Sequence, residues 1–189
     1  MKVGIYVGSF NPPHNGHFAI AKYLAKHYLD KVVIIPTGNY WDKTDLLPID
    51  VRLEMLKFIE DDSIIVQKEG SEYQFTLDIL HFLSKQYAND ELYLILGADN
   101  ISALNKWHEY KEILKYHLAI INRNGIDVKC ALKALGKPVD ECIVTDELEE
   151  IDISSTKIRN FLSAGNYEAV KELLPPEVLE YIVQKGLYK

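Results

Sequence analysis

The amino-terminal stretch of the chain combines a buried strand, a loop with two glycines and the start of a helix. Residues 2–7 are apolar and rich in β-branched and aromatic side chains, which favours a buried strand. The loop GSFNPPHNGH occupies residues 8–17, and apolar side chains then recur at helical spacing over residues 18–28. In an open α/β sheet, such loops lie at the carboxyl ends of strands, where ligands bind. This order predicts an α/β protein with a ligand-binding loop near its amino terminus.

The same alternation of strand and helix continues along the rest of the chain. Apolar runs predict further strands at residues 31–36, 63–67, 91–96, 116–121 and 141–145. Helical patterns lie between them, near residues 50–59, 75–87, 107–114 and 127–135, with Asp50 and Asp127 as expected N-caps. Two more helices are expected, one from about residue 158 and one over residues 174–188. The rhythm predicts one domain over residues 1–189, built on a doubly wound, mostly parallel sheet with helices on both faces and helices at the carboxyl end.

Composition narrows the class of protein. The chain has 189 residues, enough for one α/β domain with a sizeable core, and 48% of them are apolar without any run of membrane-spanning length. The net charge of −7 argues against general nucleic-acid binding, although local basic groups can still bind anionic small molecules. Two cysteines, Cys130 and Cys142, and an amino terminus without a signal-type segment lead us to expect a reduced compartment, the cytoplasm.

The residues of the first loop suit a bound phosphate. Gly8 allows close approach of the backbone, and the Ser9 hydroxyl can donate to a phosphate oxygen. His14 and His17 are three positions apart and share a face on a first helical turn, where two imidazoles can stabilise charge in phosphoryl or nucleotidyl transfer. The loop matches neither a Walker motif nor a dinucleotide fingerprint. Surface or capping histidines, or half of a metal site, are the alternatives; no ligand partner at metal spacing lies nearby.

A second group of polar residues, ISSTKIR, covers residues 153–159 and precedes a helical pattern. Its hydroxyl residues can cap a helix. Together with the backbone N–H groups and the cations of Lys157 and Arg159, they can also bind a phosphate at the positive end of that helix. A well-capped surface helix is the plainer interpretation.

Three more side chains have two interpretations each. Arg52 lies in an expected first helical turn, where it either meets an anion or is an ordinary solvated arginine. Asp99 follows the strand at residues 91–96, where it can accept from ribose hydroxyls, cap the next helix, or do both. Trp107 is expected at a helix start, where it either stacks on an aromatic base or packs in the core.

The two end motifs together resemble a known superfamily. His14-x-Gly16-His17 after the first strand and Ser-Ser-Thr-x-Ile-Arg at residues 154–159 are similar to the signatures of the nucleotidyltransferases with a Rossmann-like core. The segments FTLDIL at 75–80, GADN at 97–100 with Trp107, and the ending of the chain resemble the nicotinate mononucleotide adenylyltransferases. The chain departs from the family pattern at Val7, at Asn11 and in the NYWDK segment at residues 39–43.

The resemblance implies the reaction of ATP with nicotinate mononucleotide, with Mg²⁺, to give nicotinic acid adenine dinucleotide and pyrophosphate. It makes His14 and His17 the catalytic pair and places the ATP-binding loop at Gly8, Ser9, Phe10 and Gly16. It further assigns Gly97 and Asp99 to the adenosine ribose, Ser154, Thr156 and Arg159 to the ATP phosphates, Ser9 and Lys43 to the mononucleotide phosphate, and Thr76 and Trp107 to the pyridine ring. No residue is assigned as a metal ligand. The expected partners are small molecules, without nucleic acid or membrane, and a homo-oligomer is left open.

Other activities remain open at this point. A nicotinamide mononucleotide adenylyltransferase differs only in the acceptor, because both pyridine rings present the same face. Phosphopantetheine adenylyltransferase and glycerol-phosphate cytidylyltransferase share the two end motifs but are expected to lack Thr76 together with Trp107. A nucleotide-binding regulatory module without turnover is the alternative of another class, and only the changes at Val7 and Asn11 favour it.

Overall fold

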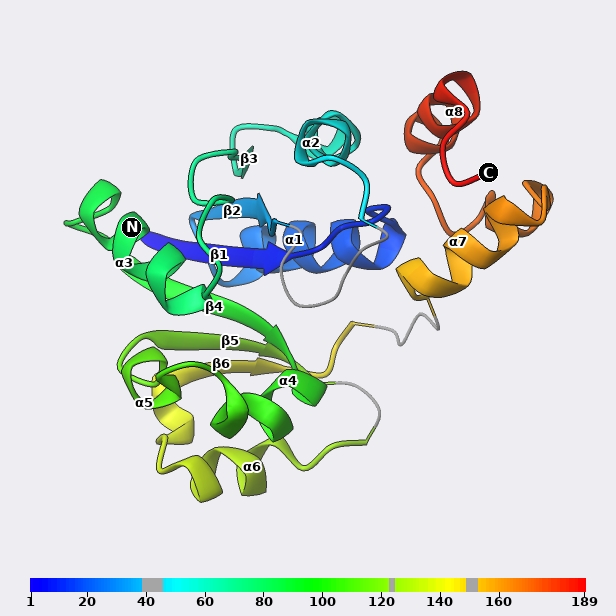
Figure 1. Cartoon of the computed structure of the whole chain (residues 1–189). Helices are drawn as coiled ribbons and strands as arrows, with labels where there is room; N and C mark the ends of the chain where they lie inside the picture. Colours follow the sequence, from blue (N-terminus) through cyan, green and yellow to red (C-terminus); the bar gives the residue numbers. More distant parts are fainter. Residues whose placement is uncertain (39–45, 123–124, 149–152) are drawn as a thin grey trace.

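A computed structural model describes residues 1–38, 46–122, 125–148 and 153–189 of the chain. Within these residues one sheet of six strands is found, in the order β3-β2-β1-β4-β5-β6, and every neighbouring pair is parallel (Figure 1). The strands are β1 (Lys2–Gly8), β2 (Lys31–Pro36), β3 (Ile64–Val66), β4 (Glu91–Gly97), β5 (His117–Ile121) and β6 (Cys142–Thr145).

Helices connect the strands and follow the last of them. The connecting α-helices are α1 (Asn15–His27), α2 (Ile49–Leu56), α3 (Thr76–Gln86), α4 (Ala98–Ala103), α5 (Tyr110–Ile113) and α6 (Val128–Leu135). The short 3₁₀ helices are η1 (Lys57–Ile59), η2 (Leu104–Lys106), η3 (Val139–Glu141) and η4 (Glu168–Val170). After the sheet come α7 (Ser155–Ser163) and α8 (Pro176–Lys185). None of the helices in these described ranges has both the length and the apolar character that a membrane-spanning segment requires.

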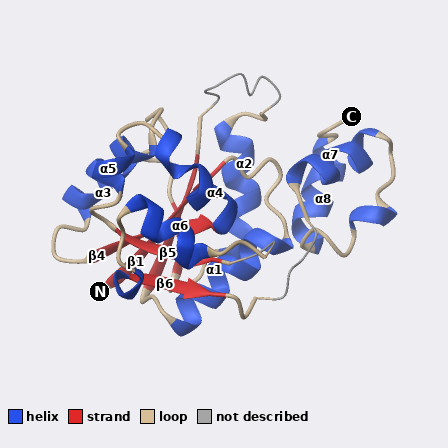
Figure 2. Ribbon diagram, turned by 90° about the horizontal axis from the view of Figure 1, so that it is seen from below, coloured by secondary structure: helices blue, strands red, loops and turns tan. Residues whose placement is uncertain are grey.

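Both faces of the sheet are covered, as the continuous apolar strands predict for a parallel sheet. Neighbouring residues of β2 illustrate this: Val32 and Ile34 enter one core cluster, and Val33 and Ile35 enter the other. The first cluster lies against α1, α2, α7 and α8, and the second lies against α3, α4, α5 and α6. Figure 2 shows the strands between helices on both sides. The predicted Rossmann-like, doubly wound architecture is confirmed.

The order in which the strands are added to the sheet reverses after β3, so that β1 and β4 are neighbours at the centre of the sheet. The first three strands run outward in the order β1, β2, β3, and β4 then pairs with the free side of β1. In doubly wound sheets this reversal opens a crevice at the carboxyl ends of the two central strands. Gly8 closes β1 and Gly97 closes β4, so both glycine-containing loops singled out in the sequence lie at this crevice.

The carboxyl-terminal helices lie beyond the carboxyl ends of the strands, where Figures 1 and 2 show α7 and α8 together beside the start of α1. The backbone N–H of Asn15 donates to the carbonyl of Leu173 at 3.0 Å, and its side-chain amide donates to the carbonyl of Glu172 at 3.0 Å. The first residue of α1 is therefore fixed by the segment that precedes α8.

Two local predictions are wrong. Asp50 is not the N-cap of α2: the cap is Pro48, and Asp50 lies in the first turn with its carboxylate 2.6 Å from Nζ of Lys68. Residues 107–114 do not form one helix, because Trp107 has an extended backbone after η2 and α5 begins only at Tyr110. The predicted cap at Asp127 is confirmed, since its carboxylate accepts from the Cys130 N–H at 2.9 Å.

Candidate active site

A pocket of about 370 Å³ lies at the carboxyl ends of β1 and β4. It reaches from the first loop, across the reversal point of the sheet, to the end of β5. The predicted site residues that line it are Gly8, Ser9, Phe10, His14, Gly16, His17, Thr76, Gly97 and Trp107. The volume falls in the range of small-molecule sites, so the pocket is the candidate active site.

Phe10 organises the first loop from within. Phe10 is 2% exposed, its backbone has a φ of 46°, and its ring meets the rings of Tyr6 and His17 edge-on with centroids 5.3 and 4.9 Å away. A Cβ at Gly8 would lie only 3.0 Å from Cζ of Phe10. Glycine is therefore required at position 8 to leave room for the Phe10 ring, independently of any ligand.

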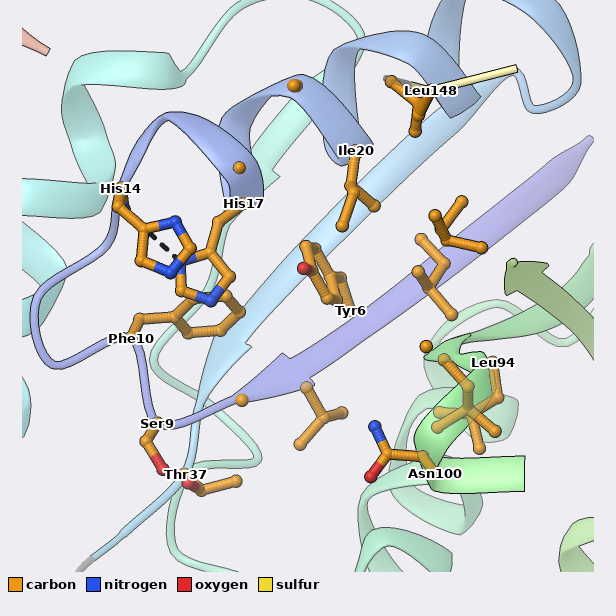
Figure 3. Close-up of a pocket in the computed structure, with 18 of the residues that line it drawn as sticks. Tyr6, Ser9, Phe10, His14, His17, Ile20, Thr37, Leu94, Asn100 and Leu148 are labelled. Atoms are coloured by element: carbon orange, nitrogen blue, oxygen red, sulfur yellow. Dashed lines mark hydrogen bonds between the residues drawn. The ribbon is translucent and has the colours of Figure 1, made fainter. Parts of the chain in front are cut away.

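His14 and His17 are brought together at the start of α1. Their rings stack with centroids 3.7 Å apart and an angle of 23° between planes, as Figure 3 shows above Phe10. His14 is the N-cap, and its backbone N–H donates to Nδ1 of His17 at 3.3 Å. A Cβ at Gly16 would lie 3.2 Å from the His14 ring, so glycine leaves room for the stack. The capping interpretation is correct for the pair, and both rings also line the pocket.

Asn11, one of the departures from the family pattern, is a buried anchor of the same loop. It is 1% exposed, and its Oδ1 accepts from the hydroxyl of Tyr188 at 2.8 Å and from the N–H of Leu47 at 3.2 Å. Burial raises the pKa of Tyr188, against the opposing effect of the positive charges of Arg159 and Arg52. The amide oxygen serves here as an acceptor, as a carboxylate oxygen could, so the exchange leaves the anchoring of the loop intact.

The second motif holds the first. The Ser155 hydroxyl donates to the Pro12 carbonyl at 2.9 Å, and Nη1 of Arg159 donates to the Asn11 carbonyl at 2.8 Å. The other terminal nitrogen of Arg159 donates to Oγ1 of Thr156 at 3.2 Å. The predicted cap is also present, because Oγ of Ser154 accepts from the backbone N–H three residues on, at 3.2 Å. Helix α7 therefore sets the path of the loop that carries the histidines.

Arg52 fits neither interpretation made from the sequence. It is 0% exposed, so it is not a solvated arginine, and its guanidinium donates to three backbone carbonyl oxygens rather than to an anion. Burial lowers the pKa of the guanidinium, and the nearby Tyr188 opposes this effect. Arginine stays protonated in proteins even so, and a buried cation therefore lies behind the pocket.

Not every predicted site residue reaches the pocket. Asp99 is exposed in the first turn of α4, where Gly97 and not Asp99 is the N-cap. The residues of the second motif, Ser154, Thr156 and Arg159, also lie outside the pocket lining. Lys43 lies outside the described residues, and its assignment stays a prediction.

The structure adds lining residues to which the sequence analysis assigned no role. Polar ones are Tyr6, Thr37, Asn100 and Asn122, and apolar ones include Ile20, Ile121, Leu148 and Ile153. Asn122 follows β5 directly and Asn100 lies in the first turn of α4, three residues after β4 ends, so their position near strand ends was a usable signal. Figure 3 shows Asn100 across the pocket from the histidines and Ser9 beside Thr37. The apolar residues carried no such signal, because their spacing is that of ordinary core positions.

The sheet order and the pocket at its reversal point define a Rossmann-like protein, and its family model places it among the nucleotidyltransferases. The family model described as cytidylyltransferase-like matches residues 5–161, most of the chain. A nicotinic acid mononucleotide adenylyltransferase from Plasmodium falciparum, solved with NaAD, has a TM-score of 0.83 at 24% identity, over 99% of this chain and 97% of that one. The same enzyme solved with APC has a TM-score of 0.81 at 25% identity, covering 99% and 96%.

Full-length relatives identify the family more closely. A protein from Caldicellulosiruptor bescii named "Probable nicotinate-nucleotide adenylyltransferase" is 34% identical over 199 residues, covering 100% of both chains. A relative of the same name from Flavobacterium johnsoniae is 32% identical over 197 residues, again covering 100% of both. The chain belongs to the nicotinate-nucleotide adenylyltransferase family.

Proposed function

We propose that the pocket between β1 and β4 is where this chain transfers the adenylyl group of ATP to nicotinate mononucleotide. The products are nicotinic acid adenine dinucleotide and pyrophosphate, a step of NAD biosynthesis. The observation that carries the proposal is the stacked pair His14 and His17, whose rings face the pocket in a chain with full-length relatives named for this activity. The regulatory module without turnover has no comparable support.

The reaction needs alignment and charge stabilisation rather than a covalent intermediate. An oxygen of the mononucleotide phosphate forms a bond to the α-phosphorus of ATP while the bond to pyrophosphate breaks. In our proposal, N–H groups of His14 and His17 bind the phosphate oxygens on which charge develops. The loop around them is fixed by donors from α7, which supports a preorganised site.

The remaining roles are divided between the two substrates. We assign Gly8, Ser9, Phe10 and Gly16 to the loop that meets the phosphates, and Ser9 with Lys43 to the mononucleotide phosphate. Gly97 and Asp99 are assigned to the ribose of ATP, and Ser154, Thr156 and Arg159 to its outer phosphates. The support for Arg159 is its position on α7 next to the histidine loop, where the guanidinium already contacts Thr156.

The pyridine ring is assigned to Thr76 and Trp107, which line the same pocket. In this proposal the indole of Trp107 stacks on the pyridine ring. Helix α3 begins at Thr76, and the residue before it, Phe75, has no side-chain acceptor to cap the first N–H groups. A helix start favours an anion, so these donors favour the carboxylate of nicotinate over the uncharged amide of nicotinamide.

We propose that Mg²⁺ enters as part of the nucleotide substrate. Over the described residues, no group of three or more histidine, cysteine, aspartate or glutamate side chains gathers to hold an ion. Magnesium is commonly bound through substrate phosphates with few protein ligands, and this arrangement fits that mode. We also propose that the protein acts in the cytoplasm, which is consistent with the free thiols of Cys130 and Cys142.

A pyrophosphate-release assay tests the activity. Purified protein with ATP and Mg²⁺ is given nicotinate mononucleotide, nicotinamide mononucleotide or phosphopantetheine in turn, and CTP with glycerol phosphate in a further arm. We expect the highest kcat/KM with nicotinate mononucleotide, by about tenfold or more over the nicotinamide form, because a hydrogen bond to a charged group contributes about 1.5–3 kcal/mol. A preference for the nicotinamide form would overturn the choice of acceptor. Turnover only with phosphopantetheine or CTP would overturn the proposal as a whole.

A further inference from the structure

The guanidinium of Arg52 joins three separate pieces of the chain. Its Nε donates to the carbonyl of Leu47 at 2.8 Å, Nη1 to the carbonyl of Ser9 at 2.6 Å, and Nη2 to the carbonyl of Thr37 at 2.8 Å. Ser9 follows β1, Thr37 follows β2, and Leu47 precedes α2. One planar guanidinium therefore binds the residues that follow two neighbouring parallel strands and the segment that precedes α2, the helix on which Arg52 lies.

These contacts lie directly behind the pocket. Ser9 and Thr37 both line it, and Figure 3 shows their side chains next to each other at its edge. The Thr37 N–H also donates to the carbonyl of Gly8 at 2.8 Å, which extends the pairing of β1 and β2 by one residue. Rotation of either peptide would move a lining side chain, and Arg52 opposes such rotation by occupying both carbonyls.

Burial of this arginine is not explained by packing alone. Its neighbours on α2, Leu53, Met55 and Leu56, are buried apolar residues, and a residue of that type at position 52 would avoid the cost of removing a cation from water. Lysine would keep the charge but could not present a rigid planar fork to three acceptors. The three carbonyls therefore require arginine in particular.

We propose that Arg52 is a positioning residue that fixes the Ser9 and Thr37 wall of the pocket for the phosphate of the mononucleotide. The inference rests on the proposed function, which assigns Ser9 to that phosphate. Arg52 does not itself line the pocket, so it acts through the backbone of these two residues. Ser9 also belongs to the ATP-binding loop, but the donors that we assign to the outer phosphates of ATP lie at the start of α7 and on it, and they do not contact Arg52 in the described part of the chain.

The two substrates therefore respond differently to a change at this position. For Arg52→Met we expect KM for nicotinate mononucleotide to rise about tenfold or more, the scale of one lost charged hydrogen bond, with KM for ATP changed by less than about threefold. Arg52→Lys should recover part of the loss, because an ammonium can still reach one carbonyl. Steady-state kinetics with each substrate varied in turn measure this, at a temperature where circular dichroism shows every variant folded.

Met55→Ala is the matched control, because Met55 is 0% exposed on the same helix and lies in the apolar core. It should lower the melting temperature without changing either KM. If Arg52→Met does not fold, Arg52→Lys alone carries the comparison. A pattern of KM values in the Arg52 variants equal to that of Met55→Ala would overturn the positioning role. Absence of turnover in the unaltered protein would instead overturn the proposed function, so the two failures are distinguishable.

Discussion

His14 and His17 combine two duties in a few atoms. The pair caps the start of α1 through the hydrogen bond from the His14 backbone N–H to Nδ1 of His17, and the same two rings line the pocket. The capping duty explains why the helix begins at Asn15, earlier than the apolar pattern from residue 18 indicates. The loss of one imidazole therefore affects both the helix and the chemistry, and the two effects differ in size.

His17→Ala should lower kcat by about 10²-fold or more, the scale of one lost electrostatic donor in the transition state. Its free energy of unfolding should fall by only about 1 kcal/mol, because an N-terminal capping contact is lost. Pyrophosphate release and thermal melts measure the two quantities. His81→Ala on the exposed surface of α3 is the control and should match the unaltered protein. Near-normal turnover of His17→Ala would refute its catalytic role.

Tyr188 makes the stability of the folded protein depend on pH. Burial raises the pKa of its hydroxyl above the ordinary value of 10.0, so the folded state holds this proton more tightly than the unfolded state. The resulting stability is fully present below pH 10 and is lost as the pH rises from there toward the folded-state pKa. Tyr188→Phe should be less stable by about 1 kcal/mol at neutral pH, because the bond to Asn11 is absent.

Melting temperatures between pH 8 and pH 11 test this dependence. The unaltered protein should lose stability more steeply than Tyr188→Phe above pH 10, so that the gap between them narrows. Parallel curves over the whole range would show that the Tyr188 hydroxyl does not titrate differently on folding.

At the scale of elements, α7 holds the first loop in place. Arg159 and Ser155 occupy the carbonyls of Asn11 and Pro12, which lie more than 140 positions earlier in the chain. The sequence indicated a helix start suited to a phosphate, and that local feature is present. The contacts with the loop could not be predicted, because periodicity and capping patterns describe neighbours along the chain only.

Arg159→Ala should therefore have two consequences. KM for ATP should rise about tenfold or more through the lost charged contact, and kcat should fall because the Asn11 carbonyl loses its donor. Direct titration of nicotinate mononucleotide should show affinity changed by less than about threefold. Ser155→Ala is a useful comparison: it removes only the bond to Pro12 and should lower kcat without the rise in KM for ATP. Equal weakening of both substrates by Arg159→Ala would show that its assignment to ATP is wrong.

For the whole molecule, the sequence predicted the sheet and its covering helices because both faces of a parallel sheet demand long apolar strands. It predicted the first loop because strand, loop and helix are contiguous there. It misjudged Trp107 because η2 and α5 are too short to give a period, and it misjudged Arg52 because the partners of this residue lie on other segments. That residues 1–189 form one domain, and the roles of individual site residues, stay predictions.

The proposed need for Mg²⁺ also concerns the reaction as a whole. A chelator of divalent cations should abolish pyrophosphate release, and Mg²⁺ added above the ATP concentration should restore it. Mg²⁺ without nucleotide should leave the melting temperature unchanged, because the ion is proposed to bind through the phosphates. A clear rise in melting temperature with Mg²⁺ alone would indicate a protein-held ion and contradict this proposal.

The fastening of the first loop by the last helices has a consequence for synthesis. The loop at residues 9–17 is synthesised well before the residues that hold it, Ser155, Arg159, Leu173 and Tyr188. At about 5–20 residues per second, the interval lasts roughly 10 to 35 seconds. During that time the strands can begin to form while the histidine loop lacks its supports. Competence for adenylyl transfer therefore requires the carboxyl-terminal helices, which are synthesised after every strand of the sheet.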